Sequence, residues 1–191
     1  MLNADYAIEF NLALKLKLKF IAILNCMLLI CINNISFAQS GTIKTNTSES
    51  WNNWIVDDGK IRTYTSEDWD HWQYTIDGES GNIKTYTSKD WDYWEVDGGK
   101  IKIKTYTSED WDYWEVTGNG IQIKIKTYTS EDWDHWKVSG DVVASMKTYT
   151  SEDWDHWEVS GKLSSLTPPV KAAILFIPIF TSSIYIRGKV N

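Results

Sequence analysis

Hydrophobic and polar residues alternate along much of the chain from residue 51 onward. Residues 121–126 read IQIKIK, and the shorter stretch 114–116 reads WEV. A period of two places successive side chains on opposite faces of a β-strand. The residues between these stretches, TGNG, are typical of a tight turn. The pattern therefore predicts a β-hairpin with a short and a long strand. No window of ten residues after the N-terminal segment has helical periodicity, so no helix is expected there.

The predicted hairpin belongs to a unit that occurs six times. The segment TYTSEDWDHW occupies residues 63–72 and returns unchanged at 127–136 and 148–157, with variants at 45–54, 85–94 and 105–114. Each copy contains two tryptophans, and the first tryptophans are 18, 22, 20, 22 and 21 residues apart. A period near twenty is typical of an array whose units cannot fold alone. We predict an all-β, antiparallel hairpin array, and a meander, a barrel and a solenoid remain open.

Most length differences between the repeats are steps of two residues. Residues 100–105 read KIKIKT where residues 60–63 read KIRT. A step of two leaves every side chain on its own face of the strand. We therefore predict a core made of the second tryptophan of each pair, the Val or Ile that follows it, and the isoleucines of the long strands. The opposite face is expected to carry lysines, the tyrosines and the first tryptophans. The last interval is odd, and we expect a β-bulge within residues 141–146 to absorb it.

The N-terminal segment, residues 1–38, has the composition of a secretory signal. Lysines 15, 17 and 19 precede an apolar run at 20–32, and small residues stand at Ser36 and Ala38. This order predicts cleavage after Ala38 and export to the cell surface or the medium. An N-terminal membrane anchor is the alternative, although the run is short for a span. Both cysteines lie within this segment, so the predicted repeat domain, residues 39–165, has no thiol.

Charge and motif content restrict the classes of function. The chain has 19 Lys and Arg against 26 Asp and Glu, a net charge of −7, so nucleic acid is not an expected partner. No glycine-rich phosphate loop, nucleophile elbow or metalloprotease motif is present. His71, His135 and His156 share one repeat position with Tyr93 and Tyr113. Tyrosine cannot replace a catalytic base or a histidine metal ligand, so we interpret this position as a polar surface position. We predict no enzyme, no cofactor and no metal site.

Acidic residues flank the first tryptophan in five repeats, for example Glu67, Asp68 and Asp70 around Trp69, whereas the first copy has Ser50 and Asn52 beside Trp51. Carboxylate oxygens are the ligands that calcium prefers. The cluster lacks the glycine-turned loop of calcium motifs, and Lys89 replaces the glutamate in another copy. A solvated turn is therefore the favoured interpretation, with calcium binding as the alternative.

A tyrosine precedes the first tryptophan by five residues in five repeats. Exposed aromatic rings stack on sugars and bind quaternary ammonium groups through cation-π contacts. We predict a Tyr/Trp ladder that binds a polysaccharide or cell-surface glycan, with nearby carboxylates as hydrogen-bond acceptors. The residues concerned are Tyr64, Trp69, Tyr86, Trp91, Tyr106, Trp111, Tyr128, Trp133, Tyr149 and Trp154, with Asp68, Asp90, Asp110, Asp132 and Asp153. The alternative is that these rings form a second small core.

The array of short aromatic hairpins is similar in outline to the choline-binding repeats of bacterial surface proteins. Their glycine-tryptophan and paired-tyrosine pattern is absent here, so the resemblance implies no site residues. The rival hypothesis for function is structural: the repeats form a stalk, or self-associate through sheet edges, without any small ligand.

The C-terminal tail, residues 166–191, differs from the repeats. It contains Pro168-Pro169-Val170-Lys171, then Ile184-Tyr185 and Gly188-Lys189-Val190. This order resembles a truncated C-terminal sorting domain of type IX secretion substrates, in which the motifs lie in short strands. The resemblance implies passage through that export machinery and release or attachment at the cell surface. Its apolar stretch is too short for a membrane span.

Overall fold

A computed structural model describes residue 17 and residues 39–48, 50–57 and 59–186. The chain forms two compact units, Met1–Phe37 and Ala38–Asn191. The predicted signal, apart from Lys17, lies outside the described residues. The second unit contains the repeats and the tail, and β1 begins at Gln39, directly after the predicted cleavage position.

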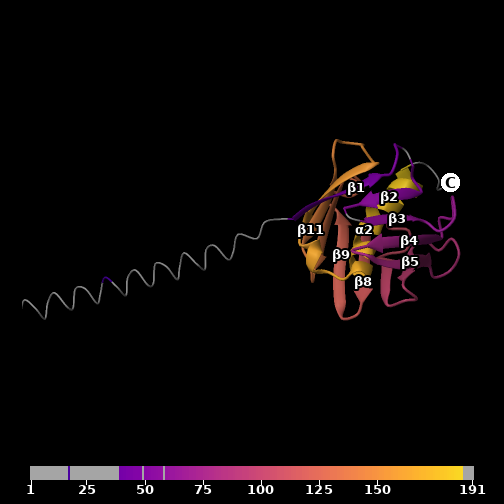
Figure 1. Ribbon diagram of the computed structural model, residues 1–191, viewed down its shortest axis with the longest axis horizontal. Helices are drawn as coiled ribbons and strands as arrows, with labels where there is room; N and C mark the ends of the chain where they lie inside the picture. Colours follow the sequence, from indigo (N-terminus) through magenta and orange to yellow (C-terminus); the bar gives the residue numbers. More distant parts are fainter. Residues whose placement is uncertain (1–16, 18–38, 49, 58, 187–191) are drawn as a thin grey trace, which may run out of the picture. The chain divides into compact units, whose positions relative to one another are not determined.

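The repeats form a closed antiparallel barrel of twelve strands (Figure 1). Each strand pairs with its neighbours in sequence, and β1 pairs with β12 to close the ring. The predicted all-β hairpin array is confirmed, and among the three arrangements left open it is the barrel. The strands are β1 (Gln39–Thr45), β2 (Asn53–Val56), β3 (Gly59–Thr63), β4 (His71–Ile76), β5 (Glu79–Thr85), β6 (Tyr93–Val96), β7 (Ile101–Thr105), β8 (Tyr113–Gly118), β9 (Ile121–Thr127), β10 (His135–Gly140), β11 (Ala144–Thr148) and β12 (His156–Gly161).

Short connections join the strands of five hairpins, β2–β3, β4–β5, β6–β7, β8–β9 and β10–β11, at one end of the barrel, which we call the turn end. The sixth pair, β12 with β1, joins the two ends of the array. Asn119 and Gly120, between β8 and β9, have φ of 50° and 78°. Positive φ at both central residues is the geometry of a type I′ turn, which Asn-Gly favours. Pairing is continuous through β10 and β11, and five residues, 139–143, connect the paired Val138 and Ala144. The odd interval is therefore absorbed by a longer connection, and the expected bulge within 141–146 is wrong.

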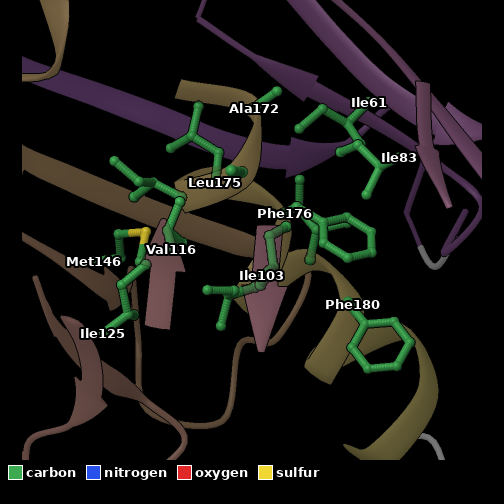
Figure 2. Packing of buried hydrophobic residues seen from close by; sticks show 14 of the residues in the cluster. Ile61, Ile83, Ile103, Val116, Ile125, Met146, Ala172, Leu175, Phe176 and Phe180 are labelled. Atoms are coloured by element: carbon green, nitrogen blue, oxygen red, sulfur yellow. The ribbon is translucent and has the colours of Figure 1, made fainter. Parts of the chain in front are cut away.

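The interior of the barrel contains the predicted core. Each second tryptophan is at most 1% exposed, and these residues are Trp54, Trp72, Trp94, Trp114, Trp136 and Trp157. Val116 pairs with Ile123 across β8 and β9, and both are fully buried. Figure 2 shows isoleucines from several strands pointing towards the same interior space.

A helix fills the centre of this core. Helix α2 (Pro168–Thr181) follows the short 3₁₀ helix η1 (Leu163–Ser165) and ends in a single π-helical turn, η2 (Ser182–Ile186). Eleven of its fourteen residues are buried, and Figure 1 shows it surrounded by strands. The ring of Phe176 lies 4.8 Å from that of Trp94, and Phe180 lies 4.8 Å from the same indole. Burial of each phenylalanine stabilises the fold by about 1.5–3 kcal/mol.

Helix α2 has no helical periodicity of hydrophobic and polar residues, because nearly all of its residues are apolar and buried. Helices that are apolar on all sides have no polar face and therefore no amphipathic period. Pro168 and Pro169 stand at the first positions of α2, where a missing N–H costs nothing. The expectation of no helix after the N-terminal segment is wrong. The tail forms a helix where the sorting-domain resemblance implies strands, and Gly188-Lys189-Val190 lies outside the described residues.

Contacts at its two ends set the direction of α2. Lys171, in its first turn, forms a salt bridge with Asp77 in the β4–β5 turn. Ser183, just after α2, donates a hydrogen bond of 2.8 Å to the carbonyl of Trp51 at the opposite end of the barrel. The helix therefore runs from the turn end to the other end. Within the described residues, no helix has the length and apolar character required to span a membrane.

Candidate functional site

Six eight-residue loops lie at the end of the barrel opposite the turns, which we call the loop end. Each connects the threonine at the end of one strand to the second tryptophan of the repeat. In one of them, residues 106–113 connect Thr105 to Trp114, and these two residues pair across the sheet. Inside this loop the N–H of Asp110 donates to the carbonyl of Thr107 at 3.0 Å. Glu109 between them has a left-handed φ of 62°. The same conformation recurs at Glu67, Lys89, Glu131 and Glu152. The loops are therefore structural copies of one another.

The aspartate after each first tryptophan binds the loop of the next repeat. Asp92 accepts hydrogen bonds from the hydroxyl of Ser108 at 2.8 Å, the N–H of Glu109 at 2.8 Å and the indole nitrogen of Trp111 at 3.1 Å. Asp70 makes the equivalent three contacts one repeat earlier. Sequence reasoning missed this role, although the signal is an aspartate at one position in five copies, replaced by Asn52 in the first. These carboxylates hold the loops together.

The first tryptophans pack at the loop end against the core. Five of them are half-buried, and Trp133 is 9% exposed. The ring of Trp111 lies 5.2 Å from Phe180 and 6.2 Å from Trp91. The indole nitrogen of Trp114 donates to the carbonyl of Trp111 at 2.8 Å, and four other repeats repeat this bond. The first tryptophans therefore extend the core towards the barrel mouth. Their rings pack against the main core and do not form a second, separate one.

A groove of about 960 Å³ crosses three neighbouring loops at the loop end. Its lining combines the indoles of Trp91, Trp111 and Trp133 with acidic side chains of the same loops, including Asp90 and Asp110. Among the described residues, no group of three or more histidine, cysteine or acidic side chains is arranged to hold a metal ion. The groove therefore has aromatic and acidic walls.

The predicted aspartates have structural neighbours in these loops. Asp68, Asp90, Asp110, Asp132 and Asp153 are half-buried, and the N–H of each closes its loop turn. Asp110 also accepts a hydrogen bond from the N–H of Asp112 at 3.3 Å. A hydrogen bond with Asp155, followed by burial, raises the pKa of Asp153 above its usual value. The carboxylate of Asp153 also accepts a hydrogen bond of 3.3 Å from the hydroxyl of Thr150 in the same loop turn.

The tyrosines lie outside the barrel, separate from the first tryptophans. Tyr64, Tyr86, Tyr106, Tyr128 and Tyr149 are 54–68% exposed. Each stacks on the ring seven residues later in its own loop, with centroids 4.2–4.9 Å apart and planes within 23° of parallel. The stacked partners are His71, Tyr93, Tyr113, His135 and His156. We call these ten residues the aromatic belt.

The belt replaces the predicted single ladder. The structure brings the tyrosines together with the His/Tyr position and places the first tryptophans at the mouth of the core. The exchange of His and Tyr at that position now has a physical reason, because both offer a flat ring for parallel stacking. This exchange was the available signal for the missed belt residues. A hydrogen bond to Tyr113 raises the pKa of Lys124 beside the belt.

No family model matches the chain, and no curated protein or solved structure is significantly similar to it.

Proposed function

We propose that this protein is an exported, non-catalytic binding protein that recognises a glycan through the aromatic belt. The observation that carries the proposal is the exposure of five tyrosine rings, each already stacked on a second ring. Exposure of a large aromatic side chain to water is unfavourable. The five tyrosine rings lie outside the barrel and have no packing role in its core. Flat rings with one free face suit the apolar faces of sugars.

Stacking within the belt prepares it for a ligand. The partner ring restricts the tyrosine side chain before any ligand arrives, as Tyr113 does for Tyr106 at 4.4 Å. A restricted side chain loses less conformational entropy on binding. The repeated arrangement also provides several equivalent contacts for a repeating polymer, which gains affinity by multivalency.

Export is supported by the signal-like N-terminal segment and by the start of β1 at Gln39, directly after the predicted cleavage position. Passage through the type IX machinery is part of the proposal and rests on the resemblance of the tail alone. Pro168–Lys171, which carries part of that resemblance, is the first turn of α2.

The closed barrel disfavours one form of the rival structural hypothesis, self-association through sheet edges. Self-association through sheet edges requires unpaired strands, and all twelve described strands have two neighbours in the closed barrel. This arrangement favours a ligand on the outer surface over edge-to-edge assembly.

Binding of the purified full chain to a panel of immobilised polysaccharides tests the proposal. The double variant Tyr106→Ala/Tyr128→Ala should lower the affinity by about thirtyfold, since each of the two lost stacking contacts is worth about 1 kcal/mol. Val143→Ala is the matched control, because Val143 is also exposed but lies at the turn end. Undiminished binding by the double variant would contradict the role of the belt. Failure to bind any polysaccharide would favour the structural hypothesis.

A further inference from the structure

Each stacked pair of the aromatic belt faces a lysine on the neighbouring strand. The second ring of every pair is directly opposite that lysine in the sheet, and all five lysines are exposed. The cross-strand pairs are His71 with Lys84, Tyr93 with Lys104, Tyr113 with Lys126, His135 with Lys147, and His156 with Lys44. Tyrosine, second ring and lysine therefore form a unit that repeats five times around the barrel.

Two of these lysines lie directly against the aromatic rings. The ammonium of Lys104 lies 4.0 Å from the centre of the Tyr93 ring, and that of Lys126 lies 3.8 Å from the centre of Tyr113. Cation-π contact of this kind holds an ammonium beside the ring even at an exposed site. The positive charge is thus placed on the second ring of the pair, which is stacked on the tyrosine that a sugar would contact.

The belt is positive although the whole chain carries a charge of −7. On their other side, Lys84, Lys104 and Lys147 face Glu95, Glu115 and Glu158. Lys126 instead faces Lys137, and Lys44 faces Ile55. Six lysines therefore stand against three glutamates along this row. Much of the negative charge lies in the loops at the loop end, where acidic side chains line the groove.

The spacing of the units favours a flexible chain as ligand. Each belt tyrosine comes directly after a strand, and one other strand lies between the strands of neighbouring tyrosines. Their separation is therefore roughly 10 Å at the usual strand spacing. Six repeats around a closed barrel turn each unit by about 60° from the next. Flat solid surfaces touch only one or two units of such a convex row, whereas a flexible polymer can follow it. The first repeat interrupts the row, because Asn46 and Asn53 stand at its two ring positions.

We infer that the glycan bound by the belt is an acidic polysaccharide, whose sugar rings stack on the tyrosines while its carboxylate or sulfate groups pair with the belt lysines. This inference rests on the proposed glycan-binding function and specifies the chemical class of the ligand. Charge complementarity carries it, because a neutral glycan would leave the repeated lysines without a role in recognition.

A pair of polymers with the same backbone separates the inference from the proposed function. Polygalacturonate carries one carboxylate on each sugar, and full methyl esterification removes the charge while keeping the ring. Affinity of the full chain for both forms is measured at low and at high salt. Lys104→Gln/Lys126→Gln removes two belt charges, and Lys60→Gln/Lys102→Gln is the matched control. Lys60 and Lys102 are exposed residues of β3 and β7 that face no aromatic ring across the sheet.

The expected result is binding of polygalacturonate that weakens with salt, with little binding of the ester. The Lys104/Lys126 variant should bind about tenfold more weakly, as expected for the loss of two exposed ion pairs, and the control should bind normally. Equal binding of both polymers, still lost in Tyr106→Ala/Tyr128→Ala, would overturn the acidic ligand and leave the proposed function intact. Binding of neither polymer, with a neutral polysaccharide bound elsewhere in the panel, would also overturn it. Equally tight binding of a single-stranded oligonucleotide would overturn it in favour of a general polyanion surface.

Discussion

The carboxylate of Asp70 accepts a hydrogen bond of 2.8 Å from the indole nitrogen of Trp91, which belongs to the next repeat. The same carboxylate accepts the N–H of Lys89, whose left-handed conformation directs that N–H towards it. At the closure of the barrel, Asp155 lies 3.4 Å from the hydroxyl of Thr45 in the first repeat. Side chains as well as the sheet thus join five of the six pairs of neighbouring repeats.

Removal of one such carboxylate should destabilise the whole barrel. Asp92→Ala leaves three donors of the following loop without their acceptor. We expect a loss of about 1–3 kcal/mol in the free energy of unfolding, measured by urea denaturation. Glu109→Ala is the control, because this exposed side chain lies in the same loop and its substitution keeps the backbone N–H. Equal stability of both variants would show that the carboxylate does not join the repeats.

The hairpins and most of the core can be predicted from sequence for a physical reason. Alternation is a local property, so Trp114 and Val116 must share a face with each other, as must Ile123 and Ile125. The register between the strands of a hairpin is also set locally, by two-residue turns such as Asn119–Gly120.

Closure and the central helix depend on contacts that no local pattern contains. Pairing of β1 with β12 joins the two ends of the repeat array, and Phe176 reaches Trp72 and Trp94 from outside the repeats. Only part of the aromatic belt could be predicted from the sequence. The tyrosines are visible in sequence, but whether they join the first tryptophans or the His/Tyr position depends on the path of an eight-residue loop with a left-handed glutamate.

The aromatic side chains of α2 should be essential for stability. Phe176 contacts Trp72, Trp94 and Phe180 with ring centres 4.8–5.5 Å apart. Phe176→Ala removes these contacts and leaves a cavity, so we expect a loss of about 3–5 kcal/mol. Tryptophan emission should also shift to longer wavelength. Phe176→Leu, which keeps most of the volume, should lose much less. An unchanged melting temperature in the alanine variant would place α2 outside the barrel.

Left-handed glutamates at the loop end should limit stability. Glu131 has a φ of 62°, a conformation that costs a non-glycine residue about 1–2 kcal/mol. Glu131→Gly should therefore raise the free energy of unfolding by up to about 1 kcal/mol, since glycine also loses more entropy on folding. Glu131→Val should lower it, because a β-branched side chain tolerates this region poorly. Glu95→Gly, within strand β6, is the control and should destabilise the protein. A Glu131→Gly variant less stable than the wild type would contradict the prediction.

The raised pKa of Asp153 predicts that substitution of this residue stabilises the protein to an extent that depends on pH. Asp153 shares a hydrogen bond with Asp155 and is partly buried, and both effects favour its protonated form in the folded protein. A pKa that is higher in the folded than in the unfolded state means that the folded state binds the proton more tightly. This group therefore opposes folding at neutral pH, and the penalty disappears as the pH falls through the folded pKa and below the ordinary value of 3.8.

Asp153→Asn should accordingly raise the melting temperature at neutral pH and lose this advantage in acid. Asparagine keeps the shape of the side chain and cannot be charged, so the melting temperatures of variant and wild type should converge at about pH 3. Thermal unfolding followed by circular dichroism across this range gives the comparison. Asp132→Asn, at the same position of the preceding repeat, controls for the general effect of losing one negative charge. A gain at Asp153 that persists unchanged in acid would mean that it does not come from the interaction with Asp155.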